Sequence, residues 1–183
     1  MKKFFVIMLS LLMLATTLVA CDEHPDGNMY ASELVWVNYG GSDTFYFGSL
    51  NRDKLSTNSV KHLPLYKMDS LSELEQFKAN FAGDFQFEQS HGEYESFETA
   101  TADINEEYFD TYSLFIIYVS ANSSSYKYGI EKAIVEGENY NIYVHQSNNP
   151  EIVSDDMAGW FILLTTPKSQ IDGCTVFDAQ MVS

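Results

Sequence analysis

The sequence predicts an α+β domain in which an antiparallel β-sheet is covered by one main helix. Residues 113–120 form a continuous apolar run, whereas residues 126–135 and 140–145 alternate apolar and polar side chains, as half-buried strands do. Residues 160–166 form a second apolar run, which ends at Pro167. Because these four segments follow one another along the chain, we expect them to pair in order as an antiparallel meander.

The covering helix is predicted over about residues 70–82. Ser70 and Glu73 have the spacing of a capping box, in which the side chain of each residue accepts a hydrogen bond from the backbone N–H of the other. Gly83 follows as a stop signal. Apolar residues recur at helical spacing along one face of this segment: Leu71, Leu74, Phe77 and Phe81.

Two further strands are predicted near the start of the domain. Residues 34–39 are rich in β-branched and aromatic side chains, and residues 40–43 form a turn into a return strand at 44–48. Residues 62–66 also favour an extended conformation. Pro64 cannot donate a hydrogen bond to a sheet and therefore places this segment at an edge.

The segments between these elements are predicted to be less regular. Residues 84–102 contain many acids and aromatics without clean alternation, so we expect an irregular stretch with short extended pieces. Residues 103–109 are predicted to form a helical turn capped by Asp103.

The first twenty residues have the pattern of an export signal. Lys2 and Lys3 precede an apolar stretch, and Leu18-Val19-Ala20-Cys21 ends it. This ending resembles the lipobox of bacterial lipoproteins, which implies diacylglycerol attachment to the Cys21 thiol and cleavage just before it. The expected organisation is therefore a signal peptide at 1–20, a lipidated polar tether at 21–29 and a single α+β domain at 30–183.

The charge of the chain limits its partners. It has 183 residues with 10 Lys and Arg and 26 Asp and Glu, a formal net charge of −16. Removing residues 1–20, which contain two Lys and no acid, leaves a net charge of −18. Nucleic acid is excluded as an expected partner because phosphate binding needs a basic face. Anionic lipid headgroups would also repel the acidic chain that follows residue 20, so membrane contact is expected only through the anchor on Cys21.

The last third of the chain carries a second resemblance. An apolar strand, a Ser-rich loop with Tyr126, two alternating strands around Gly137 and a final apolar strand ending in Pro167-Lys168 follow in order. This order resembles the C-terminal domain of PrcB-type subunits of protease complexes, and it implies a binding or stabilising role. That family carries Pro-Thr-Gly-Gly before the tyrosine, where this chain has Ser123-Ser124-Ser125.

Few residues suggest catalysis or ligand binding. On a strand, His91, Glu93 and Glu95 would share one face, which would suit either a divalent cation or a solvated acidic edge. Asp155-Asp156 could belong to a hydrolase pair or to a short helical turn capped by Ser154.

The other candidates favour structural roles. We expect His145 to face water and Cys174 to be a small buried apolar residue. The aromatic residues are expected mainly in the core rather than in a sugar-stacking platform. The chain has no phosphate loop, dinucleotide fingerprint or nucleophile elbow, so no cofactor is expected.

These observations favour a membrane-anchored, extracytoplasmic lipoprotein with a non-catalytic domain that binds a protein or an envelope component. The expected contact regions are the edge segment at 62–66 and the loops at 121–126 and 146–159. The first of these loops contains the candidate contact residues Asn122, Ser123, Ser124, Ser125 and Tyr126. Two alternatives remain open: a carboxylate-dependent hydrolase of envelope polymers and a divalent-cation-binding module.

Overall fold

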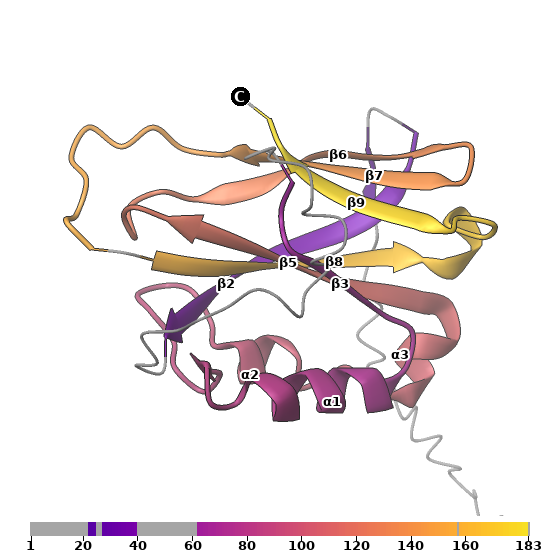
Figure 1. The fold of residues 1–183 in the computed structure, drawn as a ribbon, viewed down its shortest axis with the longest axis horizontal. Helices are drawn as coiled ribbons and strands as arrows, with labels where there is room; N and C mark the ends of the chain where they lie inside the picture. Colours follow the sequence, from indigo (N-terminus) through magenta and orange to yellow (C-terminus); the bar gives the residue numbers. More distant parts are fainter. Residues whose placement is uncertain (1–21, 25–26, 40–61, 157, 183) are drawn as a thin grey trace, which may run out of the picture.

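The computed structural model describes residues 22–24, 27–39, 62–156 and 158–182, and it confirms a mixed α+β fold. Three layers are stacked (Figure 1): a small sheet, a large central sheet and a layer of helices. The predicted return strand at 44–48 lies outside the described residues.

The large sheet has the path β1-β2-β8-β5-β3, and β4 pairs with the last two residues of β2, Asn38 and Tyr39. All of these strands pair antiparallel. Their bounds are β1 Asp22–Glu23, β2 Met29–Tyr39, β3 Leu65–Met68, β4 Phe85–Gln86, β5 Tyr112–Ala121 and β8 Ala158–Pro167. The strand predicted at 34–39 is thus part of β2, and the predicted edge segment leads into β3, the outer strand of the path.

The small sheet contains β6, β7 and β9. Its strands are β6 Tyr128–Glu136, β7 Asn139–Gln146 and β9 Val176–Met181. β6 and β7 form an antiparallel hairpin, whereas β9 lies parallel to β7.

The predicted four-strand meander is wrong. Of the four predicted strands, β6 and β7 alone pair as neighbours in sequence, whereas β5 pairs with β8 over its whole length, from Tyr112 opposite Pro167 to Ala121 opposite Ala158. The burial of the strands gives the reason. β5 and β8 are apolar on both faces and must lie in a central layer, whereas β6 and β7 each have one polar face and form an outer layer.

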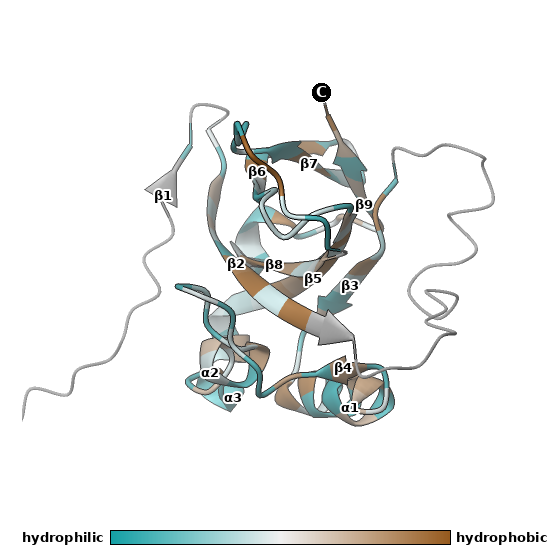
Figure 2. Ribbon diagram, turned by 90° about the vertical axis from the view of Figure 1, so that its left-hand side faces the viewer, coloured by the Kyte–Doolittle hydropathy of each residue, from teal (hydrophilic) through white to brown (hydrophobic). Residues whose placement is uncertain are grey.

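Alternate side chains of the central strands supply two separate cores. Phe115, Ile117 and Val119 of β5 pack toward the small sheet, whereas Leu114, Ile116 and Tyr118 pack toward the helices. This alternation follows from the two-residue period of a strand. Figure 2 shows the central sheet between the two outer layers.

The main helix, α1 (Leu71–Phe81), confirms the predicted one, and the same face is buried through Leu74, Phe77 and Phe81. The backbone N–H of Glu73 donates to Ser70 Oγ at 3.3 Å. The Glu73 carboxylate in turn accepts from the backbone N–H of Asp69 at 2.6 Å, one residue before the helix cap.

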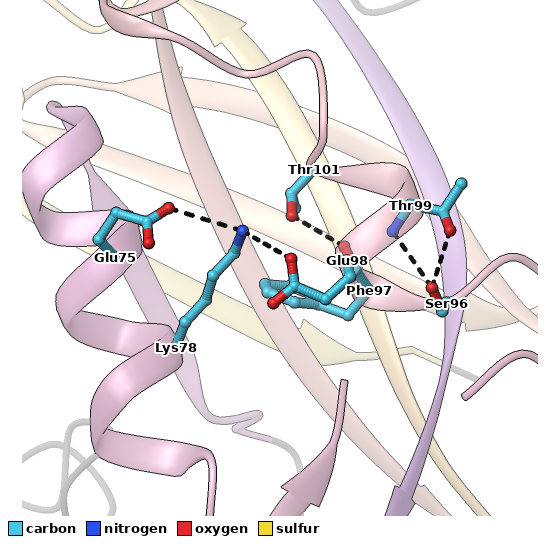
Figure 3. A network of polar contacts seen from close by, with 7 residues as sticks. All are labelled: Glu75, Lys78, Ser96, Phe97, Glu98, Thr99 and Thr101. Atoms are coloured by element: carbon cyan, nitrogen blue, oxygen red, sulfur yellow. Dashed lines mark hydrogen bonds and ion pairs between the residues drawn. The ribbon is translucent and has the colours of Figure 1, made fainter. Parts of the chain in front are cut away.

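Two short helices complete the helical layer. α2 (Phe97–Ala100) is capped by Ser96, and Lys78 of α1 reaches Glu98 of α2 at 3.1 Å and Glu75 at 3.6 Å (Figure 3). α3 (Glu106–Thr111) begins later than predicted. Its cap is Asn105, whose Oδ1 accepts from Tyr108 N at 3.0 Å, so the predicted cap at Asp103 is wrong.

The two sheets are joined along one side by the residues before β3. Leu63 N donates to Ala179 O at 2.8 Å, and His62 Nδ1 lies 2.9 Å from Asp178 Oδ1. These contacts connect the outer strand of the small sheet to the outer strand of the large sheet. An isolated bridge between His62 and Gln180 continues the small sheet by one residue.

The described part of the predicted tether has regular pairing. Asp22 and Glu23 pair with Tyr30 and Met29, and the His24 ring stacks on Tyr30 with 3.8 Å between ring centres. Met29 N also donates to Gln170 Oε1 at 2.7 Å. The described residues of the predicted tether at 21–29 are therefore paired with the domain.

Candidate functional site

The large sheet has two distinct ends, and the predicted contact loops lie at one of them. β8 begins at Ala158, opposite Ala121, and it ends at Pro167, opposite Tyr112. Residues 122–127 and 147–156 therefore meet where β5 ends and β8 begins. We call these two loops, together with residues 91–94, the loop end. The second loop projects from the left of Figure 1 and faces the viewer in Figure 2.

Serine hydroxyls join the two loops. Ser154 Oγ lies 2.7 Å from Ser123 Oγ, 3.0 Å from Ser124 Oγ and 3.1 Å from Ser125 Oγ. The backbone N–H of Ser154 also donates to Ser125 Oγ at 3.0 Å. Ser123 is buried, so its bond to Ser154 satisfies a hydroxyl that water does not reach, whereas Ser154 itself is exposed.

Asp156 and Asn148 strengthen the same connection. The Asp156 carboxylate accepts from Ser124 N at 3.1 Å, and hydrogen bonds from the Ser124 and Ser154 side chains lower its pKa to about 2. Asn148 accepts from Lys127 N and donates to Ser125 O, both at 2.8 Å. The loop 147–156 is therefore held at both of its ends by the loop 122–127.

An aromatic cluster lies at the same end. Trp36 and Trp160 meet edge to face with 5.1 Å between ring centres, and Tyr94 meets Trp160 in the same way at 5.0 Å. The exposed His91 ring stacks on Trp36 at 4.1 Å. Trp160 is fully buried, and its Nε1 has no hydrogen-bond partner among the described residues.

Lys127 joins the aromatic cluster to the serine loops. Its Nζ lies 4.2 Å from the centre of the Trp160 ring and 4.3 Å from that of Tyr94, and it donates to Ser124 O at 2.9 Å. Burial lowers the pKa of Lys127, although the charges of Glu93 and Asp156 oppose that effect. The ammonium therefore holds the loop in place over the rings through cation–π attraction and a hydrogen bond.

The structure separates the residues of the proposed cation site. His91 and Tyr94 close a tight turn by two backbone hydrogen bonds, so His91, Glu93 and Glu95 do not follow one strand face as expected. Glu95 acts instead on Glu33 of β2: burial, and then the negative charge of Glu95, raise the pKa of the Glu33 carboxyl. Within the described ranges, no cluster of three His, Cys, Asp or Glu side chains has metal-binding geometry.

Three other expectations differ from the structure. Ser154 caps no helix, because residues 151–156 form bends and its hydroxyl bonds to the other loop instead. His145 is half-buried with a buried Nδ1 that has no partner in the described part of the chain, rather than facing water. Cys174 is only half-buried, and burial together with the Asp172 charge raises the pKa of its thiol.

The sequence analysis missed an exposed apolar pair at the loop end. The Ile152 side chain is 86 % exposed and that of Val153 is 48 % exposed. Glu151 and Asp155, which flank this pair, are also exposed. Burial cannot be read from two aliphatic residues in a polar loop, since their placement depends on the bonds made by Asn148 and Ser154.

Comparison of the chain with protein-family models, with characterised proteins and with solved structures finds no match. No helix in the described ranges is long and apolar enough to cross a membrane. Residues 1–20 and Cys21 lie outside the described residues. The signal peptide, the lipidation of Cys21 and the PrcB-type resemblance therefore stay predictions.

Proposed function

We propose that this chain is a lipid-anchored protein on the extracytoplasmic face of a membrane, and that its loop end binds a protein or an envelope component without catalysis. The observation that carries the proposal is the placement of the two ends of the large sheet. Asp22, the residue after Cys21, pairs with Tyr30, and Ala31 pairs with Thr165 near the end of β8. The contact loops lie at the start of β8.

This arrangement sets the expected orientation of an anchored domain. β8 has ten residues, which at ~3.3 Å per residue separate its ends by about 30 Å. Acyl chains on Cys21 would hold the β1 end near the bilayer and leave the loop end facing away from it. The net charge of −18 would keep the rest of the domain off an anionic surface.

The polar contacts at the loop end favour binding over catalysis. The serine hydroxyls of the two loops bond to one another, and Lys127 Nζ donates to a backbone carbonyl. An activated serine needs instead a general base that takes up its proton, and the Asp156 carboxylate that accepts from Ser124 and Ser154 is a weak base because its pKa is about 2. The contacts of these groups fix the shape of the loops, and a fixed shape lowers the entropy cost of binding.

Metabolic labelling with palmitate tests the anchor. We expect label on the wild-type protein and its loss in Cys21→Ser, which should also leave the membrane fraction. Cys174→Ser is the matched control and should keep both the label and the membrane location. Label on Cys174, or an unlabelled cytosolic protein that retains residues 1–20, would refute the proposal.

A further inference from the structure

Ile152 and Val153 are exposed although the loop that carries them is well held. Asn148 on one side and Ser154 and Asp156 on the other bond to the loop 122–127. The aliphatic pair therefore stays presented to solvent at a defined position. Exposure of two adjacent aliphatic side chains to water is unfavourable, and the fully buried centre of a protein–protein interface is more apolar than its rim.

The charges around the pair limit what can cover it. Glu151, Asp155 and Asp156 are all exposed next to the two aliphatic residues, and the mature chain is strongly acidic. Insertion into an anionic bilayer would place these three carboxylates against negative headgroups. Symmetric pairing with a second copy through this loop would bring the same carboxylates face to face.

We infer that Ile152 and Val153 form the apolar centre of a contact with a partner protein whose surface has an apolar pocket bordered by Lys or Arg. This inference rests on the proposed function and adds the chemistry of the partner. The aliphatic pair fills the pocket, and the three acids at its rim meet the basic border. Such rim charges favour the right partner and speed its association.

Site-specific photo-crosslinking in isolated membranes tests the inference on the full-length lipoprotein. The photoreactive residue p-benzoylphenylalanine replaces Ile152 in one variant and Val135 in a control. Val135 is 36 % exposed and lies opposite Tyr140, whose hydroxyl reaches Thr166 at the other end of the large sheet. We expect a discrete protein adduct from position 152 and none of the same mass from position 135.

A charge reversal tests the basic border. In the position-152 variant, Glu151→Lys with Asp155→Lys should lower the adduct yield by about tenfold, the change that ~1.4 kcal/mol of binding energy produces. Glu88→Lys with Glu131→Lys changes the net charge equally at exposed sites outside the loop and should leave the yield within about twofold. Mass spectrometry should place the crosslink beside aliphatic and Lys or Arg residues of the partner.

The outcomes separate this inference from the proposed function. A lipid adduct, an adduct with a second copy or a yield unaffected by the charge reversal would overturn the inference. A third crosslinking position, Asn122, is exposed in the neighbouring loop. Protein adducts from position 122 with none from position 152 would overturn the inference and leave the proposed function standing, whereas none from either position would refute binding at the loop end.

Discussion

The ammonium of Lys127 lies 4.2 Å from the centre of the buried Trp160 ring. Lys132 offers a matched comparison, because its Nζ lies 4.7 Å from the ring of Tyr143 on the more exposed face of the small sheet. Cation–π pairs contribute more when water is excluded.

We therefore expect Lys127→Met to lower the free energy of unfolding by about 2 kcal/mol, and Lys132→Met by about 0.5 kcal/mol. Urea unfolding followed by tryptophan fluorescence measures both. The native emission should also shift in the Lys127 variant alone, because that ammonium contacts Trp160. If both variants lost the same free energy of unfolding, the Lys127 contact would contribute no more to stability than the more exposed Lys132 contact.

Asp156 makes stability at the loop end depend on pH. Its pKa is about 2 in the folded protein, below the ordinary 3.8, so the unfolded chain takes up the proton first as the pH falls. The stabilisation is present above about pH 4 and is lost as the pH falls through 2.

We expect Asp156→Asn to lower the thermal unfolding midpoint at pH 6 and to match the wild type near pH 2. Asp155→Asn removes the same charge from the exposed neighbouring residue and is the control. Circular dichroism melts between pH 2 and 7 measure the difference. If the unfolding midpoint of Asp156→Asn stayed equally far below that of the wild type at pH 2, the stabilisation could not come from the ionised Asp156 carboxylate.

Ser113 and Asp69 connect β5 to the start of α1. The buried Ser113 hydroxyl donates to Asp69 Oδ1 at 2.5 Å, and Lys67 bonds to the other carboxylate oxygen. Burial by itself raises the pKa of Asp69, but hydrogen bonds from Lys67 and Ser113 and the nearby positive charges lower it overall. The bonds to this carboxylate therefore stabilise the fold at neutral pH and are lost as the pH falls into the acid range.

Ser113→Ala should lower the free energy of unfolding by about 1 kcal/mol at pH 7. This is below the ~1.5–3 kcal/mol of hydrogen bonds to charged groups, because the Asp69 side chain is 45 % exposed. Ser120→Ala, at an exposed position of the same strand, should change stability by less than about 0.5 kcal/mol. Chemical denaturation at pH 7 and at successively lower pH compares them, and the Ser113→Ala deficit should shrink as the pH falls below the lowered pKa of Asp69. A deficit that kept its size throughout the acid range would contradict the role of the carboxylate.

Gly159 of β8 lies where the neighbouring strands β2 and β5 leave little room for a side chain. A Cβ there would stand 3.0 Å from the Tyr118 hydroxyl and 3.1 Å from the Val37 carbonyl oxygen. Gly129 is the matched control, because a Cβ there would meet its nearest neighbour, His145, at 3.6 Å, an ordinary contact distance.

Gly159→Ala should destabilise the protein by about 1–3 kcal/mol through overpacking, whereas Gly129→Ala should be close to neutral. Thermal unfolding of the two variants measures this difference. Equal stability of both would mean that β2 and β8 can move apart at little cost.

The sequence alone predicts the elements whose signals are local. The capping residue Ser70 and the apolar stripe through Phe77 identify α1, because both depend on residues within a few turns of each other. The apolar run of β5 and the alternation of β7 likewise identify strands. The start of α3 was misplaced because Asp103 and Asn105 are both good caps, and the local sequence does not choose between them.

Tertiary structure alone decides which strands become neighbours and which loops meet. The pairing of Tyr112 with Pro167 and of Tyr140 with Phe177 joins residues far apart in sequence, and no local period encodes such a choice. The loop end has the same origin, because the contacts of Ser154 with Ser123 and of Lys127 with Trp160 exist where β5 and β8 lie side by side. Local propensity thus determines the parts of this protein, while burial of two apolar faces on one central sheet determines their arrangement.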